Sequence, residues 1–100
     1  MFAAVFEYRV DPARTDAFEA TYGPGGEWAA LFGRAEGYLG TELWHDDDTP
    51  GRYLLLDRWK SAHAYAEFRR AWATEYAALS ATCTELYQAE AAVGHFSQRS

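Results

Sequence analysis

The chain contains little cysteine, little proline and few basic side chains. Its 100 residues include one cysteine, Cys83, and three prolines, and nine Lys and Arg stand against fifteen Asp and Glu, giving a formal net charge of −6. One cysteine cannot form an internal disulfide, which is typical of a reducing compartment. The acidic excess disfavours nucleic-acid and anionic-membrane partners, because phosphate groups bind to positively charged surfaces. We therefore expect a cytoplasmic protein with no nucleic-acid partner.

Long apolar runs and short catalytic motifs are also absent. No run of about 18 apolar residues occurs, so no membrane-spanning helix is expected. Residues 2–10 lack a basic leader and include Glu7 and Arg9, which favours a strand over a signal peptide. Phosphate-binding loops, CxxC pairs, HExxH and nucleophile elbows are missing. The run from His45 to Asp48 combines metal-ligand residue types, but four adjacent residues of a turn cannot converge on one ion, so we expect no metal site.

Apolar and aromatic residues are plentiful. They make up 49% and 17% of the chain, respectively, which predicts a packed globular core and argues against disorder. At this length most of the buried surface must belong to one core. We therefore expect a single domain over residues 1–100.

The local patterns predict the element order β-α-α-β-β-α-β. Asp11 and Ser61 are expected to cap helices, and a bend near Ala73 and Thr74 is expected in the last helix, which otherwise continues through Leu86. This order indicates an α+β fold of the ferredoxin-like kind, with an antiparallel four-stranded sheet and a doubled first helix. The predicted strands are 2–10, 37–46, 51–60 and 90–98, and the first two helices are 13–22 and 27–35.

Neither face of the predicted sheet is cleanly polar. In the first strand Phe6 and Val5 lie on opposite faces, and in the third strand Leu55 opposes Leu54 and Leu56. Helices can cover only one face of such a sheet, so the other must meet a different partner. We predict that a second copy of the chain covers it, in a two-fold homodimer.

Three short motifs carry a family resemblance. They are Gly-Tyr-Leu-Gly at 37–40, Pro-Gly-Arg-Tyr at 50–53 and Asp-Arg-Trp-Lys-Ser at 57–61, followed by Tyr65 and Phe68. With these motifs the chain resembles the antibiotic biosynthesis monooxygenase family of dimeric α+β barrels. The resemblance implies that fold over nearly the whole chain. It also implies an activity, since the family includes quinone-forming oxygenases and haem-degrading enzymes.

The haem-degrading members use an Asn on the first strand, and a Trp and a His on the helix after the third strand. The matching positions here are Tyr8, Phe68 and Ala78, so haem breakdown is disfavoured. The resemblance to the remaining members implies chemistry without a cofactor.

The quinone-forming members keep a Trp at the end of the third strand and a Tyr six residues later. Trp59 and Tyr65 match that spacing, whereas Leu55 and Leu79 replace an Asn and an Arg of the same subgroup. Half of that motif is therefore present.

Four residues are the candidates for catalysis. Trp59 is interpreted as a pocket wall or a core residue, and Tyr65 as a substrate contact or part of the helix core. Asp57 is either ion-paired, which we favour, or a base with a raised pKa. His45 is a candidate base, since imidazole titrates near neutral pH, with a structural role as the alternative. His95 is open to the same two interpretations.

A flat aromatic pocket would bind the substrate of such chemistry. We predict that it is lined by aromatic residues of the helices, namely Trp28, Phe32, Phe68 and Trp72. His63 is expected to point away from Tyr65, because two residues turn a helix by about 200°.

The leading functional hypothesis is a cofactor-independent monooxygenase that oxidises a small aromatic or polyketide-like compound with O2. Two alternatives remain open. One is a non-catalytic module that binds a small molecule in the same pocket, and the other is a cyclase or isomerase on the same fold. All three predict a small-molecule partner and no membrane partner.

Overall fold

The computed structural model describes residues 1–99. They form a four-stranded antiparallel sheet in the order β2-β3-β1-β4, which confirms the predicted α+β fold. The elements in chain order are β1 (Phe2–Arg9), a 3₁₀ turn η1 (Pro12–Arg14), α1 (Thr15–Tyr22), α2 (Glu27–Phe32), β2 (Tyr38–His45), β3 (Arg52–Trp59), α3 (Ala62–Ala71), α4 (Ala73–Cys83) and β4 (Ala89–Ser97).

The helix boundaries differ from the predicted ones: the first α-helix begins at Thr15, after a 3₁₀ turn, and the last helix ends at Cys83 rather than at Leu86. The long last helix is divided at Trp72, whose backbone leaves the helical region at φ −112° and ψ 25°, so the expected bend is a full break. The second helix ends at Phe32 rather than at residue 35. Both predicted caps are present: the Asp11 side chain accepts a hydrogen bond from the Ala13 N–H, and the Ser61 hydroxyl accepts one from the Ala64 N–H.

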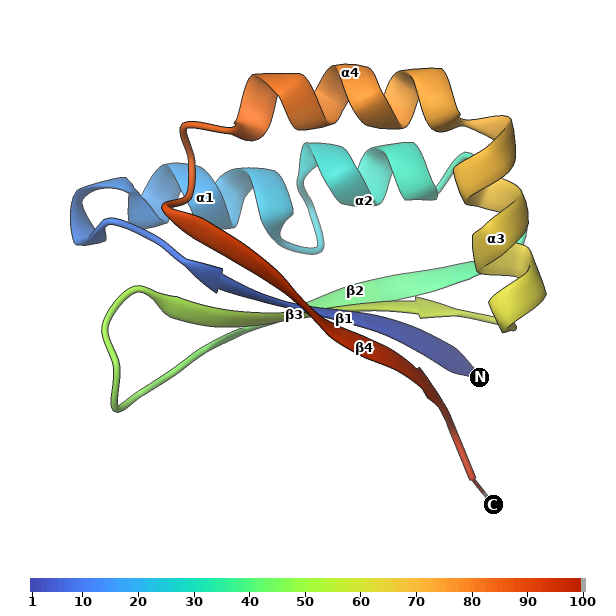
Figure 1. The fold of residues 1–100 in the computed structure, drawn as a ribbon, viewed down its shortest axis with the longest axis horizontal. Helices are drawn as coiled ribbons and strands as arrows, with labels where there is room; N and C mark the ends of the chain where they lie inside the picture. Colours follow the sequence, from blue (N-terminus) through green and yellow to red (C-terminus); the bar gives the residue numbers. More distant parts are fainter. Residues whose placement is uncertain (100) are drawn as a thin grey trace.

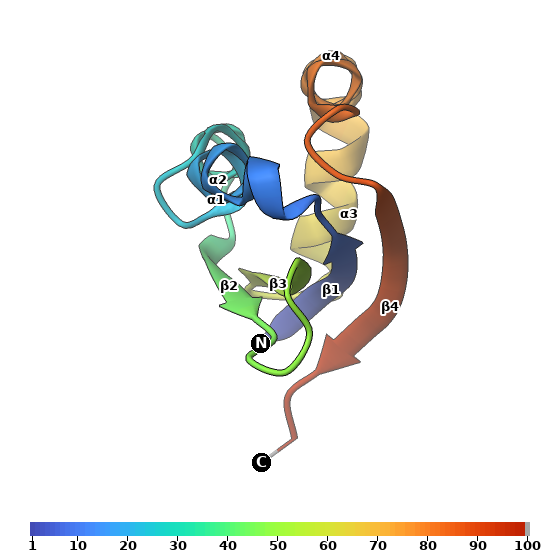
Figure 2. The same ribbon diagram turned by 90° about the vertical axis from the view of Figure 1, so that its left-hand side faces the viewer.

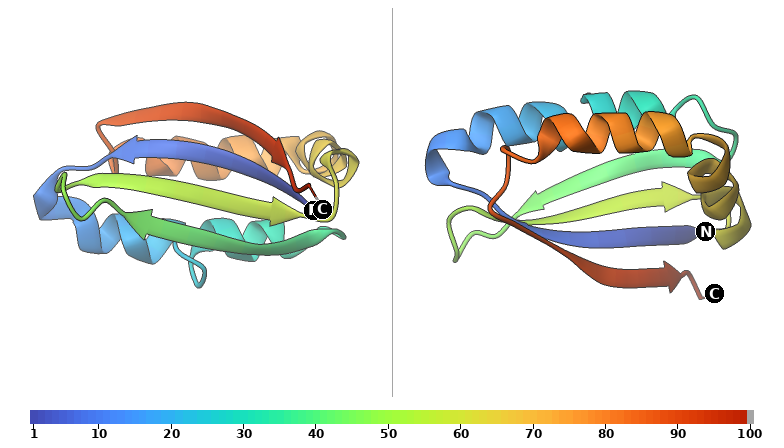
Figure 3. Two further views of the ribbon diagram at one scale, coloured as in Figure 1. Left: turned by 90° about the horizontal axis from the view of Figure 1, so that it is seen from below. Right: turned by 45° about the horizontal axis from the view of Figure 1, so that its top comes forward.

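The helices lie on one side of the sheet. Figure 1 shows α1, α2 and α4 above the strands, with α3 descending at one end of the sheet. A turned view separates α1 and α2 from α3 and α4, with β4 curving along the edge beneath the second pair (Figure 2). Seen from below, the strands lie in front of the helices and nothing covers them (Figure 3).

The core fills the space between the helices and the covered face of the sheet. Trp59, Phe18 and Phe68 are its largest fully buried side chains. Most aromatic rings pack edge-on or tilted, as in the Phe32–Trp59 pair at 5.7 Å between ring centroids, whereas Phe18 and Tyr22 are stacked. Burial of these rings supplies most of the driving force for the fold.

The uncovered face of the sheet combines apolar and charged side chains. Trp44, Leu54 and Phe96 are 59%, 37% and 52% exposed, respectively, around the buried Val5. Arg52 pairs with Glu7 at 2.5 Å. The face thus carries charges of both signs around a central apolar area. Within residues 1–99, no helix has the length and apolar character needed to cross a bilayer.

Candidate functional site

A cavity of about 40 Å³ lies between the sheet and the helices. Side chains from both layers form its wall, and most of them are aromatic. They are Phe6 and Tyr8 of β1, Tyr22 of α1, Trp28 and Phe32 of α2, Leu55 and Asp57 of β3, Tyr76 and Ser80 of α4, and Glu90 of β4. A cavity of this size has room for water molecules, but it is well below the roughly 300–1,000 Å³ typical of pockets for drug-sized ligands.

Asp57 places a buried carboxyl group in the cavity wall. Its side chain is 3% exposed, and Thr41 lies directly opposite it in the register of β2 and β3. The Thr41 hydroxyl donates a hydrogen bond of 2.9 Å to Asp57 Oδ1. Burial raises the pKa of Asp57 to about 6, and the hydrogen bond from Thr41 partly opposes that shift.

The ion pair favoured for Asp57 from the sequence is absent. Among residues 1–99 no basic side chain lies within ion-pair distance of its carboxylate. The Asp57 side chain faces the helices rather than the uncovered face of the sheet. The carboxyl group is therefore an isolated titratable group in an aromatic setting, which is the alternative interpretation.

Three phenols surround the carboxyl group in this cavity. The Tyr8 hydroxyl donates a hydrogen bond to the Glu90 carboxylate, and burial raises the pKa of Tyr8 well above its usual value. Burial also raises the pKa of Tyr22 and Tyr76. These phenols stay protonated near neutral pH, so they act as hydrogen-bond donors rather than as bases.

Trp28 supplies a further donor. Its side chain is 7% exposed and lines the cavity, and its indole Nε1 has no hydrogen-bond partner within residues 1–99. A buried N–H without a partner costs free energy in the folded state. Burial raises the pKa of the Tyr22 phenol and the same indole partly opposes that shift, so an oxygen atom of a bound ligand would compete with the Tyr22 oxygen for this donor.

Trp59 and Tyr65 lie together, but in the core rather than in the cavity wall. Their ring centroids are 5.7 Å apart, and Trp59 is completely buried. The Tyr65 hydroxyl accepts a hydrogen bond of 3.0 Å from Arg69. Arg69 in turn lies over the ring of Tyr76, 4.1 Å from its centroid. Tyr65 is thus linked to the cavity wall through Arg69.

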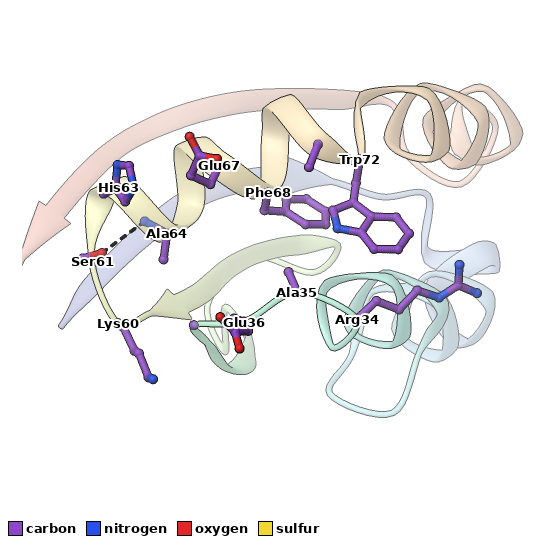
Figure 4. Close-up of a pocket in the computed structure, with 12 residues that line it drawn as sticks. Arg34, Ala35, Glu36, Lys60, Ser61, His63, Ala64, Glu67, Phe68 and Trp72 are labelled. Atoms are coloured by element: carbon purple, nitrogen blue, oxygen red, sulfur yellow. Dashed lines mark hydrogen bonds between the residues drawn. The ribbon is translucent and has the colours of Figure 1, made fainter.

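Phe68 and Trp72 lie beside a separate surface groove. This groove, of about 480 Å³, runs between α3 and the connection from α2 to β2 (Figure 4). Figure 4 shows Phe68 and Trp72 on its apolar side and charged side chains such as Glu36 and Lys60 near its rim. Of the four side chains predicted to bind substrate, Trp28 and Phe32 line the interior cavity, whereas Phe68 and Trp72 do not.

The histidines also lie outside the cavity wall. His45 is exposed at the end of β2, where its Nε2 accepts a hydrogen bond from the Gly51 N–H. His95 is exposed on β4 with its ring against Phe2 and Tyr65. His63 is exposed and borders the surface groove. Within the part of the chain that is described, no three His, Cys, Asp or Glu residues are grouped as metal ligands would be.

The sequence analysis missed several residues of the site. Tyr8 shares its strand face with Phe6, and Tyr22 lies four residues after Phe18, so both were candidates by spacing alone. Glu90 and Ser80 carried no signal, because their position depends on how α4 and β4 lie over the sheet. Thr41 could be paired with Asp57 only once the register of β2 and β3 was known.

Similar folds are found among solved structures. SnoaB, a cofactor-independent oxygenase from Streptomyces nogalater, is 21% identical, with a TM-score of 0.62 over 99% of this chain and 93% of that one. A putative antibiotic biosynthesis monooxygenase from Nitrosomonas europaea is 16% identical, with a TM-score of 0.67 over 98% of both chains. Rv0793 from Mycobacterium tuberculosis is 19% identical, with a TM-score of 0.67 over 99% of this chain and 95% of that one.

These similarities, all below 25% identity, establish the fold. A comparison with curated proteins found no match. The family model for antibiotic biosynthesis monooxygenases matches residues 1–93, which is nearly the whole chain. The resemblance inferred from the three sequence motifs is therefore confirmed, and this chain belongs to the antibiotic biosynthesis monooxygenase family.

Proposed function

We propose that the protein is a cofactor-independent monooxygenase that oxidises a small phenolic or polyketide-like aromatic compound with O2. The observation that carries the proposal is the buried carboxyl group of Asp57, which lies in an aromatic cavity and forms no ion pair with any of residues 1–99. A carboxylate whose pKa is near 6 is deprotonated at neutral pH, yet basic enough to accept a proton from a phenol held against it. Family membership and the SnoaB-like fold support the same activity.

The proposed reaction begins with proton transfer from the substrate hydroxyl to Asp57. The phenolate passes one electron to O2, and the resulting phenoxyl radical and superoxide combine to form a carbon–oxygen bond on the ring. The peroxide takes up a proton and its O–O bond breaks. The ring carbon loses its hydrogen as a proton and becomes a carbonyl, and the distal oxygen leaves as water. One phenol and one O2 thus give one quinone and one water.

Trp28 is proposed to stabilise the negative charge that develops on oxygen. Its indole N–H needs a partner and lines the same cavity as Asp57. A donor that is already in place and shielded from water stabilises an oxyanion more strongly than water does. The aromatic walls would keep water away from the peroxide.

Substrate entry requires the cavity to widen. We propose that α4 moves, because Cys83 is the one buried residue of that helix while Tyr76 and Ser80 reach the cavity. The helix packs mainly on α2 and α3 rather than on the sheet. A segment with few buried contacts opens at low cost in free energy.

A second copy of the chain is the proposed cover of the bare sheet face. Its exposed apolar side chains, Trp44, Leu54 and Phe96, would be buried in that contact. Two-fold symmetry brings the same patch of both copies together, and charges of both signs, such as Glu7 and Arg52, allow it to be self-complementary.

Oxygen consumption tests the proposed activity directly. The purified protein is treated with a chelator, freed of flavin and mixed with a panel of anthrones and hydroquinones while O2 is recorded. Uptake above the uncatalysed rate, reduced at least tenfold in Asp57→Asn and unchanged in Asp47→Asn, is the expected result. Asp47 is the matched control because its carboxylate is exposed in the turn between β2 and β3.

The second candidate is a module that only binds a small molecule. Leu55 favours it, since this apolar side chain lines the cavity at the position where the quinone-forming members carry an Asn. Saturable binding of a panel compound without O2 uptake would support binding alone. Conversion of a compound under anaerobic conditions would instead indicate a cyclase or isomerase.

A further inference from the structure

A chain of three side-chain oxygens leads from the cavity to the outer edge of the sheet. Asp57 Oδ1 accepts a hydrogen bond of 2.9 Å from the Thr41 hydroxyl, and Thr41 Oγ1 lies 2.5 Å from the Tyr38 hydroxyl. Asp57 lines the interior cavity, whereas Tyr38 and Thr41 line a surface hollow of about 420 Å³ beside the Gly25–Gly26 loop. The three groups therefore join two separate spaces across β2.

A bulge in β2 creates this alignment. Residues three apart in a regular strand point to opposite faces, but the pairing with β3 shifts between Tyr38 and Gly40. Tyr38 therefore pairs with Trp59 and Thr41 with Asp57, on one face of the sheet. Gly40 sits in the bulge at φ +139°, and a Cβ there would lie 2.8 Å from the Arg58 guanidinium. Bulges next to functional sites commonly redirect side chains in this way.

We propose that Thr41 and Tyr38 are positioning residues that orient the Asp57 carboxylate and carry its proton to the surface hollow. The inference rests on the proposed role of Asp57 as the base. After Asp57 has accepted a proton, rotation of the carboxyl group places it on Oδ1, while the Thr41 hydroxyl turns from Oδ1 to donate to Tyr38 and the Tyr38 hydroxyl turns to donate to water. The Asp57 proton then passes to Thr41 Oγ1, the Thr41 hydroxyl proton passes to Tyr38, and the Tyr38 hydroxyl proton passes to water. Each hydroxyl ends with the single proton it began with.

The route avoids the substrate, which would occupy the cavity on the other side of Asp57. It also leads the proton away from the acidic and phenolic groups that share the cavity. These groups can affect the titration of Asp57. They are Tyr8 of β1, Tyr22 of α1, Tyr76 of α4 and Glu90 of β4, with Tyr38 of β2 and Arg58 of β3 on the outlet side. Burial raises the pKa of Tyr38, and the Arg58 charge partly opposes that shift.

Carboxyl ¹³C NMR of Asp57 tests the positioning part without any substrate. The titration is recorded for the wild type, Thr41→Val, Thr41→Ser and Thr41→Ala. We expect Thr41→Val and Thr41→Ala to raise the Asp57 pKa by about one unit, because a hydrogen bond to the charged form is lost. Thr41→Ser keeps the hydroxyl and should restore the wild-type value. Equal titration in all four proteins would overturn the role of Thr41.

Relaxation dispersion of the same carbon near pH 6 tests the outlet. Tyr38→Phe keeps the bond between Thr41 and Asp57 but removes the last hydroxyl, and we expect proton exchange at Asp57 to slow at least tenfold. Tyr53→Phe, which removes a phenol bonded to Glu19 elsewhere on the sheet, should leave the rate unchanged. An unchanged rate in Tyr38→Phe would overturn the route. Since neither measurement uses a substrate, absence of O2 uptake would count against the proposed function alone.

Discussion

Thr41 of β2 and Asp57 of β3 face each other in the sheet, and the Thr41 hydroxyl is the one side-chain hydrogen-bond partner of this carboxylate within residues 1–99. The Thr41 hydroxyl is an uncharged donor, so its hydrogen bond only partly offsets the desolvation of the Asp57 carboxylate. The folded protein consequently favours the protonated form of Asp57 relative to an exposed aspartate.

The first prediction concerns the dependence of stability on pH. The pKa of Asp57 rises from 3.8 in the reference state to about 6 in the folded protein, so the folded state binds more protons between these values. The contribution of Asp57 is therefore fully present below about pH 4 and is lost as pH rises through about 6. The loss is on the order of 3 kcal/mol at its upper limit. Urea unfolding from pH 4 to pH 7 measures it.

Asp57→Asn isolates this contribution from all other titrating groups. The variant should lack this part of the pH dependence, so the difference in unfolding free energy between variant and wild type should change by about 2 kcal/mol from pH 4 to pH 7. The absolute stability of the variant is less informative, because the amide adds a donor that needs a partner. If the difference in unfolding free energy between the two proteins did not change with pH, Asp57 would not be a buried carboxylate without an ion-pair partner.

The second prediction distinguishes two buried tryptophans. Trp28 and Trp59 both have an indole N–H without a partner within residues 1–99, but only Trp28 lines the cavity. Changing either residue to Phe should lower the unfolding free energy by about 1–3 kcal/mol, because packing contacts are lost. Trp28→Phe should also lower the rate of O2 uptake about 100-fold, because a donor to the oxyanion is lost. A larger loss of rate in Trp59→Phe would restore Trp59 as the functional residue.

The third prediction concerns Gly37, the residue before β2, which packs against α3. Gly37 has φ +91°, and a Cβ there would lie 2.7 Å from the Ala64 Cβ. Gly37→Ala should therefore destabilise the protein by about 2 kcal/mol, measured by thermal or urea unfolding. Gly25→Ala is the control, since a Cβ at Gly25 meets nothing within 4 Å. Equal effects of the two substitutions would argue against a strained backbone at Gly37.

The fourth prediction concerns self-association. Leu54→Glu places a charge in the middle of the uncovered face and should shift the protein from dimer to monomer in sedimentation or light scattering. The change should cost the monomer about 1 kcal/mol, because Leu54 is 37% exposed but the new carboxylate would lie opposite Glu7 of β1. Ala77→Glu on the outer side of α4 should leave the assembly unchanged. A wild-type protein that is monomeric at high concentration would contradict the proposed cover.

The fold was largely predictable from the sequence because its signals are local. Asp11 and Ser61 mark helix starts, and β-forming residues bounded by turn residues mark the strands at 2–10 and 51–60. The break at Trp72 was predicted only as a bend, because the aromatic stripe of α3 continues into α4 at helical spacing. Local periodicity does not reveal where the axis of a helix changes direction.

The site was less predictable because it depends on layers and register. Asp57 was recognised, but its partner Thr41 lies sixteen residues away and is aligned by a bulge. Trp59 and Tyr65 were chosen on family spacing, and their proximity is real, yet they pack beside the cavity rather than in its wall. Family spacing indicates which residues lie together, and only the packed structure indicates which of them face an open space.

The central claim is that Asp57 is the proton acceptor in the cavity. It is tested most directly by the pH profile of metal-free O2 uptake on a responsive anthrone, recorded for wild type and Asp57→Asn. The wild-type rate should rise with pH through an inflection near the Asp57 pKa of about 6, because only the carboxylate can accept the proton. The variant should be slower at every pH and lack that inflection. A variant that retained the wild-type rate and profile would contradict the account.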